Sequence, residues 1–316
     1  MDGIRARLWA VACLWLVACA PAQAPVKPTA PPPPRPTPTA PAEPSAASRA
    51  LEMYYARVQA DLLTQGLLRT DAGGEDAPFT DRMLADNFLR VALYDEYTPT
   101  ATGLVQRESV SQLRRWVVPV RVGLRFGPSV PAEQAATDRA RIASYLQRLA
   151  RLTGHPIALS DASPNFWLHV VNEDERRALG PVIRAALPEL SGPEVAGLTD
   201  LPRSTYCIVY ALSAPGGEGY DRAFAVIRAE HPDLLRLSCL HEEIAQGLGL
   251  ANDSPRARPS IFNDDEEYAL LTRQDELMLR ILYSPELRPG MSLAEAEPIV
   301  RMLAARLMGA STPGGS

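Results

Sequence analysis

The segment from Glu242 to Asp253 gathers the residues of this chain that could most directly do chemistry. Glu242 and Glu243 are adjacent carboxylates, and Gln246 follows Glu242 by four positions, so Glu242 and Gln246 would share one face of a helix. Glu243 could act as a general base, provided that a metal-bound water or another device matched its pKa to the task. Glu242, Gln246 and Asn252 would offer a metal ion one carboxylate and two neutral amide oxygens. Such a set suits hard cations weakly and zinc poorly.

The spacing of this segment resembles the active-site helix of the metzincin metalloproteases. Their pattern has zinc-binding histidines at i and i+4 of a helix, a Glu general base beside the first, a Gly that ends the helix, and a third histidine after it. Glu243 and Gly249 occupy the Glu and Gly positions, whereas the three histidine positions hold Glu242, Gln246 and Asn252. The resemblance implies a zincin-like scaffold, but the donor atoms predict no stoichiometric zinc and no other cofactor. A divalent cation, if one bound, would use Glu242, Gln246, Asn252 and Asp253.

An ordinary amphipathic helix is the alternative interpretation of the same residues. In that case the apolar residues face the core, and Glu242, Glu243 and Gln246 face water. Short motif matches often arise by chance. The zincin-like interpretation instead predicts that Glu242, Glu243, Gln246 and Gly249 lie at the floor of a cleft beneath a sheet.

Residues after the motif extend the resemblance. Metzincins of the matrixin type continue through a Ser-rich loop and a Met-turn to a last helix that ends in Leu-Tyr-Gly. In this chain Phe262 stands where the Met would be, and the last helix would end at Leu282-Tyr283. Thr272 with Asp275 is typical of a helix N-cap followed by an acidic residue at the third position.

A Cys shortly before Glu-Glu-x-x-Gln-x-x-Gly-Leu is the hallmark of a bacterial envelope family known as domain of unknown function 2927. Cys239 and the run from Glu242 to Leu250 match this hallmark. The chain resembles the family over most of residues 49–300. The resemblance implies an envelope protein and assigns no activity to it.

The N-terminal residues predict export and a lipid anchor. Arg5 and Arg7 precede an apolar run, 8–17, that is too short to remain as a membrane-spanning helix. The sequence Leu-Val-Ala-Cys that ends at Cys19 resembles a bacterial lipobox, so we expect Cys19 to be lipidated; a plain secretory signal is the alternative. Ala20 replaces the Asp that retains lipoproteins in the inner membrane. We therefore expect an anchor in the outer membrane, facing the periplasm.

A Pro-rich tether follows the anchor. Eleven prolines lie between Pro21 and Pro44, a composition that favours extended polyproline II and cannot build a core. Over the whole chain, 46% hydrophobic residues, 22% charged residues and a net charge of −5 are typical of a soluble globular protein. No basic stripe favours nucleic acid as a partner.

The two cysteines after Cys19 are Cys207 and Cys239. In an oxidising envelope compartment a disulfide between them is the default, and a reactive thiol is the alternative.

Periodicity predicts an α+β fold. The expected helices span residues 50–68, 80–97, 131–153, 173–187 and 234–250, and the expected strands span 116–126, 165–171, 204–212 and 223–229. This order matches the zincin catalytic half, a twisted mixed sheet with a long helix and a motif-bearing helix packed against it, here with added N-terminal helices.

The expected division is a signal peptide (1–18), the lipidated Cys and tether (19–48), an N-terminal helical segment (49–114), the zincin-like domain (115–300), and a C-terminal helix end with a flexible tail (301–316).

The residues and resemblances favour one function and leave two alternatives. We expect a lipid-anchored envelope protein whose degenerate zincin-like domain binds a peptide, a protein or a cell-wall component without catalysis. The first alternative is an active, atypical metallopeptidase with Glu243 as its general base. The second is a structural or assembly lipoprotein that uses its tether to reach across the envelope.

Overall fold

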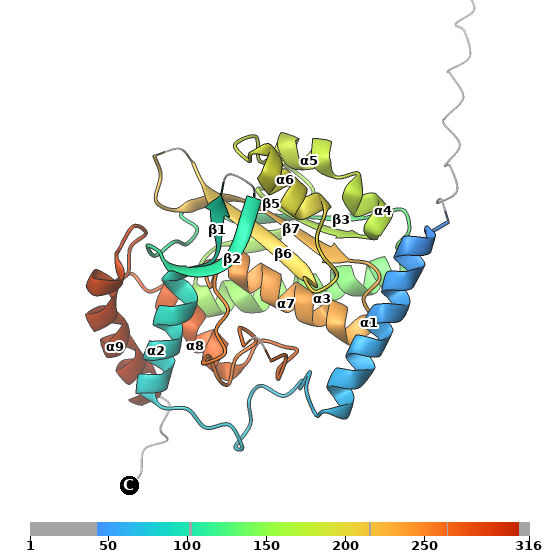
Figure 1. Ribbon diagram of the computed structural model, residues 1–316. Helices are drawn as coiled ribbons and strands as arrows, with labels where there is room; N and C mark the ends of the chain where they lie inside the picture. Colours follow the sequence, from blue (N-terminus) through green and yellow to red (C-terminus); the bar gives the residue numbers. More distant parts are fainter. Residues whose placement is uncertain (1–42, 101–102, 215, 264, 310–316) are drawn as a thin grey trace, which may run out of the picture. The chain divides into compact units, whose positions relative to one another are not determined.

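The computed structural model describes residues 43–100, 103–214, 216–263 and 265–309 (Figure 1). The predicted signal peptide, Cys19 and most of the Pro-rich tether lie outside these residues. The described helices are α1 (Ala46–Thr64), α2 (Asp81–Ala92), α3 (Ala132–Thr153), α4 (Glu173–Arg177), α5 (Gly180–Ala186), α6 (Gly192–Thr199), α7 (Asp233–Gly247), α8 (Arg273–Leu282) and α9 (Leu293–Gly309). The described strands are β1 (Tyr94–Thr100), β2 (Gly103–Val110), β3 (Val120–Phe126), β4 (Ile157–Leu159), β5 (Phe166–Val171), β6 (Cys207–Ser213) and β7 (Tyr220–Arg228).

A mixed five-stranded sheet forms the centre, in the order β4-β3-β5-β7-β6. The strands β4, β3, β5 and β7 pair in parallel, and β6 pairs antiparallel with β7. Parallel neighbours need crossover connections: α3 connects β3 to β4, and the segment from α4 to β6 connects β5 to β7. The predicted α+β class is confirmed.

Helices α3 and α7 cover one face of this sheet, here called the lower face (Figure 1). Alternate strand residues point to this face because side chains alternate along a strand. They pack with apolar residues of the two helices in one core, which includes Val122, Leu124, Phe166, Leu168, Val170, Ala225, Ile227, Ile142, Leu146, Leu149, Leu240 and Ile244.

The helices α4, α5 and α6 cover the opposite, upper face. Their apolar residues form a second core with the other set of strand residues, including Ile183, Val195, Leu198, Val171, Ile208, Phe224 and Val226. Side-chain caps start two of these short helices. Asn172 caps α4 and Ser191 caps α6, each in a reciprocal box with a Glu three residues on.

The N-terminal helices pack on this body. In α1, Ser48 donates a hydrogen bond to Glu230 (2.7 Å), and buried Tyr55 packs with Leu235 of α7. The helix α2 contacts α8 and α9. No helix among the described residues has the length and apolar character that crossing a membrane requires.

Three sequence predictions need correction. The helix expected at 80–97 ends at Ala92, and β1 follows, because the aromatic and β-branched residues from Tyr94 onward favour a strand. The helix expected at 173–187 is two helices, since Pro181 lacks the N–H that a continuous helix would use. The strand expected from residue 116 begins at Val120, directly after Pro119.

Candidate functional site

The helix α7 carries the motif and lies closely against the sheet. It starts after Pro232, with Asp233 in the first turn, where a carboxylate is favourable to the helix dipole. A Cβ atom added at Gly247 would lie 2.6 Å from the ring of Phe166 and 3.3 Å from Val209. Glycine at this position therefore permits the close contact between α7 and the strands β5 and β6.

The end of α7 is held by partners from distant parts of the chain. Trp116 Nε1 donates to the carbonyl of Gly247 (2.7 Å), and the Tyr283 hydroxyl donates to the carbonyl of Leu248 (2.9 Å). Gly249 has φ of +124°, and an added Cβ would lie 2.3 Å from the carbonyl oxygen of Arg114. The motif glycine thus ends the helix where the backbone of another segment approaches.

The motif side chains are more buried than an ordinary amphipathic helix would place them. Glu243 is 3% exposed, Gln246 is 8% exposed and Asn252 is 1% exposed, whereas Glu242 is only half-buried. The alternative in which Glu243 and Gln246 face water is therefore wrong.

Internal hydrogen bonds engage two of the three positions where metzincins have histidine. Gln246 Nε2 donates to Asp253 Oδ1 (2.9 Å). Asn252 Nδ2 donates to the carbonyl of Arg90 (3.0 Å) and to Glu108 Oε1 (3.3 Å). These bonds tie the loop after α7 to α7, to α2 and to β2.

Zinc does not fit this donor set. It consists of one carboxylate and two amides, where zinc favours imidazole and thiolate. The amides of Gln246 and Asn252 use their NH2 groups in the hydrogen bonds above, and their neutral oxygens are weak ligands for zinc. In the part of the chain that the structure describes, no three His, Cys, Asp or Glu side chains gather as a metal-binding group.

The histidine next to the motif has a structural role. His241 stacks on Tyr145 with 4.0 Å between ring centroids, and His241 Nδ1 accepts a hydrogen bond from the Leu271 N–H (3.3 Å). Burial, with a smaller contribution from the charge of Arg148, lowers the pKa of His241 to about 3. Its imidazole is therefore neutral at pH 7 and braces α7 against α3.

A disulfide joins Cys207 of β6 to Cys239 of α7, with 5.9 Å between the Cα atoms. The predicted pairing is present. It links the edge strand of the sheet to the motif helix.

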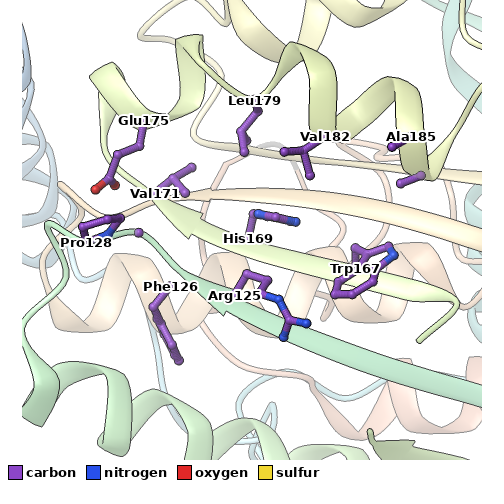
Figure 2. Close-up of a pocket in the computed structure, with 12 residues that line it drawn as sticks. Arg125, Phe126, Pro128, Trp167, His169, Val171, Glu175, Leu179, Val182 and Ala185 are labelled. Carbon is purple, nitrogen blue, oxygen red and sulfur yellow. The ribbon is translucent and has the colours of Figure 1, made fainter. Parts of the chain in front are cut away.

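Two cavities are described in this structure, and neither is lined by the motif. The larger one, about 510 Å³, lies on the upper face between β3, β5 and α5 (Figure 2). The smaller one lies near His155 and Tyr283. The cleft expected at Glu242, Glu243, Gln246 and Gly249 stays a prediction.

Sequence reasoning missed the polar and amphipathic strand residues of the larger cavity, which are Arg125, Trp167 and His169. A signal was present in the alternation of β3 and β5. Both strands are central, yet each carries bulky polar or amphipathic residues on the face opposite its apolar set. That pattern marks a face that a helix covers only in part.

A family model described as protein of unknown function (DUF2927) matches residues 81–302, more than half of the chain. The chain belongs to this family. The match runs from α2 to within α9, so it includes the whole sheet, the motif helix and both bridged cysteines. The comparison with curated proteins and the comparison with solved structures each found no match.

Proposed function

We propose that this chain is a lipid-anchored envelope protein whose zincin-like domain binds an extended peptide segment without cleaving it. The donor chemistry of the motif carries this proposal. In a working zincin site, three imidazoles would hold the zinc ion. Here the corresponding positions hold the carboxylate of Glu242 and the amides of Gln246 and Asn252, which bind zinc poorly.

The order of elements supports the zincin-like part of the proposal. A strand, a long helix, further strands and then the motif helix follow one another as β3, α3, β4 to β7 and α7. The motif helix packs beneath a mixed sheet, which is the arrangement that the resemblance implies (Figure 1).

The edge strand β6 supports peptide binding. Among the described strands, β6 pairs with β7 alone. No backbone hydrogen bond joins Cys207–Ser213 to a described residue outside β7. An unpaired strand edge is a template onto which an extended peptide can add as a further strand. The disulfide at Cys207 ties this edge to α7.

Amide hydrogen exchange tests this proposal. The probe is a pool of peptides of about ten residues, long enough to pair along a whole strand, produced by digesting denatured casein. At a free concentration of about ten times the dissociation constant, a bound peptide should slow exchange in β6 about tenfold. The opposite edge strand, β4, is the internal control and should show no change.

The same samples measure cleavage. We expect mass spectrometry to find no new peptide fragments, either with the unaltered chain or with Glu243→Gln. Unchanged exchange in β6 with every peptide pool would refute peptide binding at this edge. Fragments that disappear in Glu243→Gln would establish the metallopeptidase alternative instead.

A further inference from the structure

The larger cavity lies on the upper face of the sheet, and it belongs to neither the motif nor β6. The strands β3 and β5 form its floor with Arg125, Trp167 and His169. The wall opposite consists of apolar residues at and within α5, namely Leu179, Val182, Ala185 and Ala186. Figure 2 shows the side chains of Val182 and Ala185 on the helix side, across from Trp167 and His169. A volume of about 510 Å³ is within the range of small-molecule sites.

Glycines give this cavity its shape. A Cβ atom at Gly123 would lie 2.8 Å from the indole of Trp167, and one at Gly127 would lie 1.9 Å from the carboxylate of Glu175. Gly123 therefore leaves room for Trp167 to lie over β3. Gly127 allows Glu175 to reach Ser129, whose N–H and hydroxyl both donate to it (2.7 and 2.8 Å).

A positive charge lies over the indole of Trp167 on the floor of the cavity. The guanidinium of Arg125 lies 4.7 Å from the ring centroid of Trp167. Arg125 is exposed and makes no ion pair with any of the described residues. Glu175, the acidic residue of the lining, is engaged by Ser129 and by the N–H of Asn172 (2.9 Å). Glu175 keeps its negative charge but lies at the end of the cavity away from Trp167 (Figure 2), so the charge beside the indole is that of Arg125.

The imidazole of His169 is the second polar group. His169 is 6% exposed and stacks on Phe224 at 4.6 Å, and its Nε2 is buried with no hydrogen-bond partner among the residues that the structure describes. Buried polar atoms in native proteins nearly always have a partner, so this nitrogen is one that a ligand could satisfy. Burial and the charge of Arg125 lower the pKa of His169 to about 4. The neutral ring offers one N–H donor and one acceptor.

We propose that this cavity binds a small amphipathic carboxylic acid, with an apolar or aromatic body between Trp167 and α5 and a carboxylate directed to Arg125 and His169. The apolar wall and the indole give the body its contacts. The guanidinium supplies a charge-assisted hydrogen bond, the strongest kind available to a carboxylate. Val182, which is 45% exposed at this wall, would lose water contact when the site fills.

Calorimetric titration of the full chain with 4-phenylbutyrate tests this inference, with 4-phenylbutyramide as the neutral probe of equal shape. The acid should bind at least about tenfold more tightly than the amide, since a hydrogen bond to a charged group contributes that much or more. Arg125→Gln should abolish this difference, leaving the weak binding of the amide unchanged. His169→Phe keeps a ring to stack on Phe224 and should also weaken binding of the acid.

Arg121→Gln is the matched control, because Arg121 lies four residues before Arg125 on β3 and is absent from the lining of the cavity. It should bind both probes as the unaltered chain does. Equal affinity of the unaltered chain for acid and amide would overturn the inference, and so would the absence of binding by either probe. Both outcomes are measured on the unaltered chain, so they do not depend on whether a variant folds. They also do not bear on peptide binding at β6.

Discussion

Close packing explains both glycines of the motif, Gly247 and Gly249, and this explanation requires no metal. Gly247 lets α7 lie against Phe166, and Gly249 accommodates the carbonyl of Arg114. Spacing could place Glu243 and Gln246 on a helix, but it could not predict their burial. Nor could it predict that Asn252 is held by Arg90 of α2 and Glu108 of β2, which lie far from it in the sequence.

Gly249→Ala should be strongly destabilising. The change places a side chain at φ of +124° and within 2.3 Å of the Arg114 carbonyl. Gly66→Ala is the matched control, since Gly66 also has a positive φ (+77°) but nothing within 4 Å of its added Cβ. Urea unfolding should give a free-energy loss of about 1 kcal/mol for Gly66→Ala, from backbone strain. Gly249→Ala should lose about 1–3 kcal/mol more, from overpacking. Equal losses would show that the backbone approach at Gly249 does not constrain the helix end.

At the scale of elements, long segments with strong apolar periodicity were predicted correctly, whereas short elements were not predicted. The helix expected at 131–153 is α3, and Gly154 ends it with φ of +67°, as a helix-terminating glycine does. The strands β5 and β7 lie where their apolar runs predicted them. In contrast, β4 has three residues and α6 has eight, too few for a period to be distinguished from chance.

The pairing of the strands could not be predicted from the sequence. Periodicity shows which residues share a face, but the order β4-β3-β5-β7-β6 depends on which edges meet during folding. The cysteines were the exception. Cys207 and Cys239 predicted correctly that β6 and α7 lie in contact, because a disulfide requires it.

At the scale of the whole molecule, the upper and lower faces of one sheet carry separate proposals. The lower face packs on the motif helix, whose carboxylates and amides are buried or half-buried. The upper face is open over β3 and β5. The two proposals therefore place a peptide at β6 and a small acid at the cavity, so the two ligands would not compete.

The predicted anchor concerns the whole chain as well. We expect Cys19→Ser to release the protein from membrane fractions, because the lipid would be lost and no described helix is suited to cross a membrane. Immunoblots of separated membrane and soluble fractions measure this. Cys13→Ser serves as the control, since Cys13 lies within the apolar run of the predicted signal. Retention of Cys19→Ser in the membrane would refute the lipid anchor.

Metal analysis of the full chain, purified without chelator and then dialysed against zinc, tests the central claim most directly. If the motif is a non-catalytic remnant, zinc should stay well below one ion per chain. The small zinc content that remains should be the same in the double variant Glu242→Ala and Gln246→Ala. One tightly bound zinc per chain that this double variant removes would contradict the account and make Glu243 the base of a working metallopeptidase.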